Sequence, residues 1–191
     1  HLLSRRQRQM CIRDSIKRLL DIVLSGCALI VLSPLLLVTA ILVRVKLGSP
    51  VIFCQERPGR DEKIFKLHKF RSMSDARDEN GNLLPDEIRL GRFGRNLRAT
   101  SLDELPELWD IFRGKMSIVG PRPALYNQYD LIEAREKVHA NDVRPGLTGL
   151  AQVNGRDELP IDVKAKYDGE YAAHVTFGMD CSIFFRTIGY V

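Results

Sequence analysis

The sequence has few cysteines and none of the spacings that build metal or disulfide sites. No C-x-x-C pair and no neighbouring pair of histidines is present, and the four cysteines are far apart: Cys11, Cys27, Cys54 and Cys181. This pattern argues against a zinc site and against a disulfide-stapled secreted domain. We expect reduced thiols, as in a cytosolic protein.

Several common catalytic signatures are also missing. The sequence contains no P-loop, no G-x-G-x-x-G dinucleotide fingerprint, no G-x-S-x-G and no H-E-x-x-H. Serine hydrolase and zinc chemistry therefore find no support. The 14 glycines and 9 prolines follow no fixed period, which excludes a collagen-like or repeat architecture.

The chain has no net charge outside its first 18 residues. Those residues carry six basic side chains and one acidic one, so they account for the whole formal charge of +5. The remaining body is neutral. A diffuse basic surface for nucleic acid is therefore not indicated, and we expect no nucleic-acid partner.

One long hydrophobic run dominates the N-terminal part. Residues 22–43 are uncharged, and at about 1.5 Å per residue they could cross a hydrocarbon core of about 30 Å as a helix. Ser33 and Pro34 lie at the midpoint, where proline breaks or kinks a helix. Lysine and arginine flank both ends equally, whereas a spanning helix usually carries more of them on one side. We therefore favour a re-entrant membrane hairpin over residues 16–46; a kinked span and a buried soluble helix stay open.

The segments on either side of this hairpin differ. Residues 1–15 have no clear period and no start methionine, and we interpret them as a non-native or disordered basic segment, although a lipid-seeking arm would also fit. Residues 47–191 form the polar body, interpreted as a cytoplasmic catalytic domain. Within it, residues 51–55 and 64–71 are typical of a strand hairpin. The apolar segment 179–191 is either core or an interfacial helix.

The stretch 101–112 carries apolar residues at helical spacing. Ser101 and Glu104 form a possible capping box, or Asp103 is the cap and Pro106 occupies the first turn. Either arrangement places the adjacent carboxylates of Asp103 and Glu104 at a helix N-terminus, which favours the ionised form and attracts phosphate. From the spacing, ordinary capping and a role as nucleophile or metal ligand both remain open.

A set of basic residues lies in turns rich in glycine or proline. Arginine is suited to bidentate phosphate binding, and the neutral body does not need these residues for solubility. The set is Lys69, Arg71, Arg95, Arg98, Arg122 and Arg156. Pro121 and Pro123 restrict where the Arg122 guanidinium can point. Together with a hard divalent cation, the carboxylates and arginines indicate phosphoryl chemistry at a membrane surface.

Four motifs, in this order along the chain, resemble the bacterial sugar transferase family, the monotopic phosphoglycosyl transferases, and in particular its small PglC-like type. They are Lys69-Phe70-Arg71-Ser72-Met73, Ser101-Leu102-Asp103-Glu104-Leu105-Pro106-Glu107-Leu108, Met116-Ser117-Ile118-Val119-Gly120-Pro121-Arg122-Pro123 and Arg144-Pro145-Gly146-Leu147-Thr148-Gly149-Leu150-Ala151-Gln152-Val153-Asn154-Gly155-Arg156. The resemblance covers roughly residues 16–191. It implies a mixed α/β, mostly helical fold: a re-entrant helix-break-helix hairpin at Ser33 and Pro34 and a small cytoplasmic catalytic domain with interfacial amphipathic helices.

The resemblance also implies a reaction. A sugar-1-phosphate would move from a UDP-sugar to undecaprenyl phosphate with release of UMP, as the first membrane step of glycoconjugate biosynthesis. It implies Asp103 as the nucleophile of a covalent aspartyl-phosphosugar intermediate, and Mg²⁺ held by Asp103 and Glu104. The residues expected to bind substrate are Lys69, Arg71, Arg98, Pro121, Arg122, Pro123, Asn154 and Arg156.

The expected location is the cytoplasmic face of the bacterial inner membrane, where a monotopic enzyme meets the UDP-sugar, undecaprenyl phosphate and the bilayer. A homodimer or downstream glycosyltransferases are further expected partners. Two other hypotheses stay open: a non-catalytic, membrane-anchored protein that binds polyprenyl phosphate, and a Mg²⁺-dependent phosphatase. No motif identifies the sugar.

Overall fold

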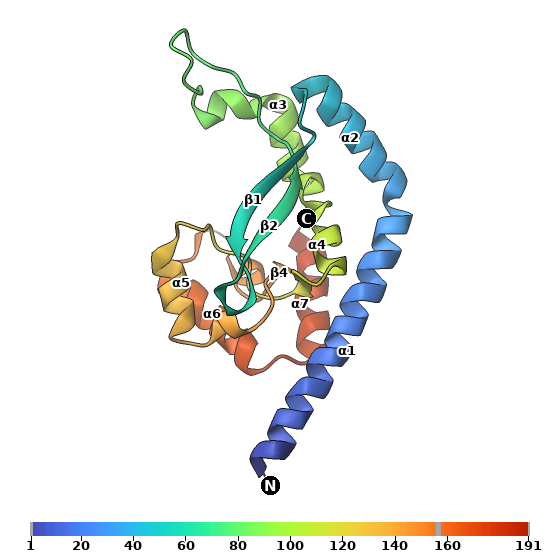
Figure 1. Cartoon of the computed structure of the whole chain (residues 1–191), viewed down its shortest axis with the longest axis vertical. Coiled ribbons are helices and arrows are strands. Elements are labelled where there is room, and N and C mark those ends of the chain that lie inside the picture. Colours follow the sequence, from blue (N-terminus) through green and yellow to red (C-terminus); the bar gives the residue numbers. More distant parts are fainter. Residues whose placement is uncertain (1, 156–157, 191) are drawn as a thin grey trace.

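Two helices form a long bow along one side of the molecule (Figure 1). The computed structural model describes residues 2–155 and 158–190. Helix α1 (Leu2–Val31) is followed after one residue by α2 (Ser33–Leu47), and the pair Arg13–Val31 and Ser33–Leu47 is bent by 63°. In the described part of the chain no single helix is long and apolar enough to cross a membrane, but by length and composition this bent pair could be a broken span or a re-entrant loop.

The bend falls where the sequence predicts the break. Pro34 lies in the first turn of α2 and has no N–H to donate back into α1. The Ser33 hydroxyl donates to the Ile30 carbonyl at 2.7 Å, so it satisfies an acceptor near the break. The predicted helix-break-helix is thus confirmed, whereas its insertion in a membrane is a separate question.

Helix α1 begins at Leu2, so residues 2–15 are helical and continuous with the hairpin. The interpretation of residues 1–15 as a non-native or disordered segment stays a prediction, as do the domain limits after residues 15 and 46.

The first part of the body is an antiparallel hairpin, as predicted. Strand β1 (Ile52–Pro58) pairs with β2 (Ile64–Phe70), with Ile52 opposite Phe70 and Pro58 opposite Ile64. Phe65 and Leu67 are buried on one face of β2, where they pack against the short helix α4 (Glu107–Phe112).

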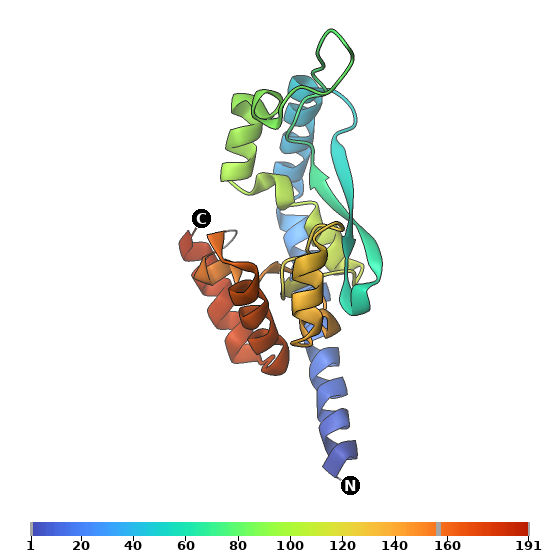
Figure 2. The same ribbon diagram turned by 90° about the vertical axis from the view of Figure 1, so that its left-hand side faces the viewer.

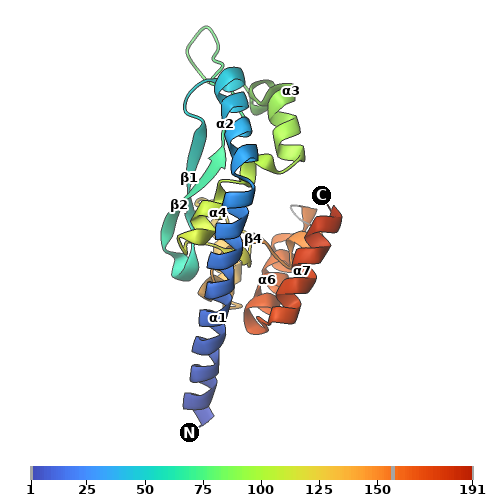
Figure 3. The same cartoon turned by 90° about the vertical axis from the view of Figure 1, so that its right-hand side faces the viewer.

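The rest of the body is mostly helical, which confirms the mixed α/β class. The remaining elements are α3 (Asp86–Ala99), β3 (Ser117–Val119), α5 (Tyr129–Glu136), β4 (Gly146–Thr148), α6 (Ile161–Ala173) and α7 (Phe177–Tyr190). Figures 2 and 3 show α6 and α7 on one side of the α1–α2 bow and the β1–β2 hairpin on the other.

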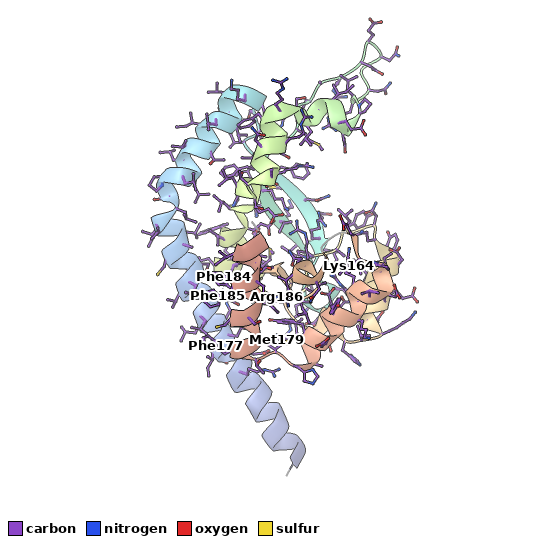
Figure 4. All side chains as sticks on the ribbon, turned by 180° about the vertical axis from the view of Figure 1, so that it is seen from behind. Lys164, Phe177, Met179, Phe184, Phe185 and Arg186 are labelled. Atoms are coloured by element: carbon purple, nitrogen blue, oxygen red, sulfur yellow. The ribbon has the colours of Figure 1, made fainter. Side chains whose placement is uncertain are left out.

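Helix α7 has one face in the core, as one of the two alternatives for segment 179–191 predicted, and the interfacial role stays a prediction. Ile183 is fully buried in a cluster with Val119 of β3 and Tyr171 of α6. Phe184 and Phe185 are exposed along the same helix (Figure 4). One face is therefore core, and the other is apolar and uncovered, as an interfacial helix requires.

Strands β3 and β4 are parallel, and their backbones lie in very close contact near Gly120. A Cβ on Gly146 would lie 2.1 Å from the amide nitrogen of Gly120, and one on Gly149 would lie 2.2 Å from the Gly120 carbonyl oxygen. Only glycine permits this approach. This close contact fixes residues 120–123 against residues 146–149.

We expect Gly149→Ala to lower the free energy of unfolding by about 2 kcal/mol or more, because backbone atoms must move apart to admit the methyl group. The matched control is Gly178→Ala in α7, where a Cβ meets nothing within 4 Å. Thermal unfolding in lipid nanodiscs compares the two variants. Equal melting temperatures for both variants would contradict the close backbone contact between β3 and β4.

Candidate active site

The two adjacent carboxylates lie in a 3-10 turn (Leu102–Glu104) between α3 and α4, not at the start of a long helix. The predicted capping box is wrong: the Ser101 side chain makes no capping bond, and only its backbone carbonyl accepts from the Glu104 N–H, at 3.2 Å. Asp103 is not the cap either, because Pro106 is the N-cap of α4. Ser101 is left-handed, with φ of 54°, so the chain turns sharply before Asp103.

Asp103 is a buried carboxylate, with 7% of its surface exposed. Burial raises its pKa, as does the charge of Glu104, while the charges of Lys69 and Arg98 lower it. Among the described residues no ion pair ends on Asp103. The group is therefore partly desolvated and not neutralised by a direct cation partner.

Glu104 is held by two cations. Lys69 Nζ lies 2.7 Å from Glu104 Oε1, and the Arg122 guanidinium donates to the same oxygen. Burial alone would raise the pKa of Glu104, but the charges and hydrogen bonds of Arg122 and Lys69 bring it down to about 2. Glu104 is thus a permanent anion that joins β2 to the loop carrying Arg122.

Glu107 also belongs to this cluster, although the sequence analysis gave it no role. It is 2% exposed, and its Oε1 lies 3.1 Å from Lys69 Nζ, a close ion pair without hydrogen-bond geometry. Burial raises its pKa to about 7, and Lys69 opposes that shift. Glu107 is one helical turn after Asp103 and Glu104, which is the signal that could have found it.

Arg57 is the second residue that the sequence analysis missed. Its guanidinium donates to Gln55 Oε1 and, at 3.1 Å, to the Pro123 carbonyl. Pro123 directly follows Arg122, so β1 supplies a second arginine beside the one from the loop. The predicted strand ended at residue 55, whereas β1 continues to Pro58, so nothing in the sequence indicated where the Arg57 side chain lies.

Helix α3 brings Arg98 near the carboxylate turn. A Cβ on Gly94 would lie 2.0 Å from the Ser72 carbonyl, so α3 packs directly on the segment that follows β2. Arg98 Nε donates to Ser72 Oγ at 3.0 Å. From this place its charge lowers the pKa of Asp103, and its predicted binding of substrate stays a prediction.

Other predicted site residues have structural partners. Buried Arg71 donates to the carbonyls of Ser49 and Met73, at 2.7 and 2.8 Å, and pairs with Asp75. The Pro121 carbonyl accepts from the Gly146 amide at 2.9 Å, so it fixes the Arg122 loop on β4. Substrate binding by Arg71, Pro121 and Pro123 remains untested.

Asn154 is tied to helix α7. Its Nδ2 donates to the Leu150 carbonyl at 2.8 Å, and its Oδ1 accepts from Arg186 at 2.9 Å. Figure 4 labels Arg186 on α7, beside the exposed Phe184 and Phe185. Arg156 lies outside the described residues.

The carboxylates fit a magnesium ion that is bound together with substrate. Within residues 2–155 and 158–190, no group of three or more His, Cys, Asp or Glu residues could hold a metal by itself. Mg²⁺ is commonly held by one or two carboxylates plus substrate phosphates and water. Asp103 offers a carboxylate to which no cation of the described segments is paired, and the Glu104 carboxylate is adjacent but shared with Lys69 and Arg122.

We expect Glu107→Gln to raise the free energy of unfolding more at pH 8 than at pH 5. The pKa of Glu107 in the folded state is about 7, above the ordinary 4.5. Its neutral carboxyl group therefore contributes to the free energy of unfolding in full below pH 4.5, and this contribution is lost as the pH rises through 7. Glutamine keeps the shape and cannot ionise, so the gain between the two pH values reaches at most about 3 kcal/mol. Denaturant unfolding measures it, with the exposed Glu56→Gln as control; a gain independent of pH would contradict the buried acid.

Comparison with known proteins assigns the chain to a family. The chain is 43% identical to the uncharacterized sugar transferase EpsL of Bacillus subtilis, over 91% of this chain and 85% of that protein. It is 40% identical to the UDP-glucose:undecaprenyl-phosphate glucose-1-phosphate transferase of Klebsiella pneumoniae, over 90% of this chain and 39% of the relative. It is 34% identical to the UDP-N-acetylgalactosamine-undecaprenyl-phosphate N-acetylgalactosaminephosphotransferase of Aeromonas hydrophila, over 91% of this chain and 43% of the relative.

The chain thus spans less than half the length of the two relatives whose names state an activity. The profile of the family described as bacterial sugar transferase matches residues 12–191, which include the hairpin, the carboxylate turn and the arginine loop. The chain therefore belongs to the bacterial sugar transferase family.

Proposed function

We propose that this protein transfers a sugar-1-phosphate from a UDP-sugar to undecaprenyl phosphate and releases UMP, as the first membrane step of glycoconjugate biosynthesis. The observation that carries this proposal is the buried Asp103 carboxylate, which has no ion-pair partner within residues 2–155 and 158–190, next to Glu104, which two cations hold. The relatives named for transfer to undecaprenyl phosphate support the same reaction class.

In the proposed mechanism, an Asp103 oxygen attacks the phosphorus that bears the sugar. The new oxygen–phosphorus bond forms as the bond to the bridging oxygen breaks, and UMP leaves with that oxygen. A phosphate oxygen of undecaprenyl phosphate then attacks the same phosphorus, and the bond to Asp103 breaks. Burial favours this role because a carboxylate with little hydration is a stronger nucleophile.

Lys69 and Arg122 are suited to neutralise the negative charge that the diphosphate of the UDP-sugar brings into the site. The diphosphate would repel an attacking carboxylate unless cations neutralise it. Glu104 fixes both cations before substrate arrives, which removes part of the cost of ordering long side chains. When bound, Mg²⁺ held by Asp103 and Glu104 would neutralise further charge on the phosphates.

We further propose that the α1–α2 bow is a re-entrant membrane hairpin. Both of its flanks are attached to the same body: Asp21 of α1 accepts from the Ile118 amide at 3.0 Å, and Val43 of α2 is fully buried against Phe70 and Leu97. A kinked span would place these flanks on opposite sides of the membrane. A single body that is attached to both flanks cannot lie on both sides.

The outer face of the bow supports membrane contact rather than a buried soluble helix. Its large apolar side chains are exposed, and they include Val23, Leu24, Ile30, Val31, Leu37, Val38, Ile41 and Leu42. Water-exposed apolar surface of this extent is typical of membrane or partner contact. The cytoplasmic face of the bacterial inner membrane is the proposed location, because soluble UDP-sugar and lipid phosphate meet there.

The sugar and the protein partners are less defined. The Klebsiella and Aeromonas relatives are named for different sugars, yet each matches about nine tenths of this chain. The chemistry of the carboxylate turn is therefore compatible with more than one sugar. A homodimer or downstream glycosyltransferases remain hypotheses.

One experiment separates transfer from its two rivals. The full chain is incubated with radiolabelled UDP-sugars, with and without undecaprenyl phosphate. Lipid-linked label with UMP release supports transfer. Free sugar phosphate formed without the lipid would indicate a phosphatase, and binding of the lipid with no turnover of any UDP-sugar would indicate a carrier protein.

We expect Asp103→Asn to abolish turnover, because the amide is no nucleophile, and to abolish the phosphosugar adduct on the peptide that contains residue 103. UMP release and mass spectrometry of quenched reactions measure the two effects. Asp162→Asn, at an exposed site in α6, should behave as the wild type. Near-normal UMP release by the Asp103 variant would reject the covalent step.

We expect single cysteines placed at Ile16 and Lys46, in a chain whose native cysteines are replaced, to be labelled from the same side of sealed vesicles. Both positions are exposed and flank the proposed hairpin. A membrane-impermeant maleimide reports the side, before and after the vesicles are opened. Labelling from opposite sides would overturn the re-entrant arrangement.

A further inference from the structure

The mechanism proposed above gives Arg57 no role, but the position of its side chain indicates a role in binding substrate. The side chain comes from β1, and its guanidinium reaches the loop that carries Arg122. Gln55 Oε1 accepts from Nε at 3.2 Å and from one terminal nitrogen at 2.8 Å, and the Pro123 carbonyl accepts from the other at 3.1 Å. These bonds fix the guanidinium on the backbone of Pro123, the residue directly after Arg122, before any ligand binds.

The two arginines repel each other. Burial lowers the pKa of Arg57, and the charge of Arg122 lowers it further, while Glu107 and Glu104 act in the opposite direction. Glu104 is shared by Arg122 and Lys69. The positive charges of Arg57 and Arg122 act on each other, and an anion bound between them would relieve this repulsion.

Arg57 also keeps hydrogen-bonding capacity for that anion. A guanidinium has five N–H groups, and three of those of Arg57 are used by Gln55 and Pro123. In the part of the chain that the structure describes, each terminal nitrogen is left with one N–H that has no partner. Arg57 is only partly buried and the Arg122 side chain is 37% exposed, so a ligand can reach both.

We propose that Arg57 and Arg122 together form a phosphate-binding subsite, in which the β1 arginine is oriented by Gln55 and Pro123 and the loop arginine by Glu104. This inference rests on the proposed function. The phosphate belongs either to the diphosphate of the nucleotide donor or to the lipid acceptor, since both present the same chemistry to a guanidinium. Planar guanidinium groups suit this task because they bind phosphate oxygens in pairs.

The test uses Arg57→Gln, Arg57→Lys and the control Arg60→Gln, all in the full chain in nanodiscs. Arg60 lies three residues further along the same hairpin, and its contacts with Asp14 and Asp61 are exposed surface pairs. The dissociation constants of UDP and of uridine are measured by calorimetry. The Michaelis constants for the turned-over UDP-sugar and for undecaprenyl phosphate are measured separately.

We expect Arg57→Gln to weaken UDP binding about tenfold or more, as for a lost charge-assisted hydrogen bond, with uridine binding unchanged. The Michaelis constant for the donor rises while kcat changes little, because the contact is made before the reaction as well as during it. Arg57→Lys recovers part of the loss, and Arg60→Gln has no effect. If the Michaelis constant rises for the lipid instead and UDP binding is unchanged, the subsite holds the acceptor phosphate.

The inference is overturned if Arg57→Gln leaves UDP affinity and both Michaelis constants at the values of the control. It is also overturned if uridine and UDP lose affinity equally, because Arg57 would then only shape the loop. If Arg57→Gln fails to fold, Arg57→Lys decides by the same ratio of UDP to uridine affinity. A wild type that binds UDP but transfers no sugar phosphate would count against the proposed function, and the UDP measurement would still judge the subsite.

Discussion

The arrangement of the site depends on the ion pairs of Glu104. Its carboxylate meets Lys69 of β2 and Arg122 of the loop after β3, so it joins three segments that are far apart in the chain. Because Glu104 takes up these two cations, the adjacent Asp103 has no cation partner of its own among the described residues. Two neighbouring carboxylates therefore differ in state: one is a fixed anion and the other a buried group with a raised pKa.

The hairpin is connected to this site by polar contacts as well as by packing. Arg18 of α1 donates to the carbonyls of Ile111 and Phe112 at 2.6 and 2.7 Å, at the C-terminal end of α4. A cation at that end complements the helix dipole. Helix α4 also carries Glu107 and begins directly after the carboxylate turn. The helix pair proposed to enter the membrane thus supports the element that positions the carboxylates.

Local patterns predicted the elements better than they predicted the site. The break at Ser33 and Pro34 and the β1–β2 hairpin depend on proline geometry and on alternation, which act over a few residues. The capping box failed because Ser101 adopts a left-handed conformation, which packing around the turn decides. Arg57 and Glu107 were not predicted because each has an important partner far away in the chain: Arg57 donates to the Pro123 carbonyl as well as to its neighbour Gln55, and Glu107 pairs with Lys69.

By itself, the sequence determined the helix break, the neutral body, the order of the four motifs and the pair of adjacent carboxylates, since all of these follow from residue identity and spacing. Only the tertiary structure decided which carboxylate is neutralised, which strand arginine donates to the loop that carries Arg122, and which predicted ligands are committed to backbone carbonyls, as Arg71 is. The physical reason is that charge and burial act through space: a side chain's state depends on neighbours that the fold supplies. Some of these neighbours are distant in the chain, since Lys69 and Glu104 are 35 residues apart and Arg57 and Pro123 are 66 residues apart.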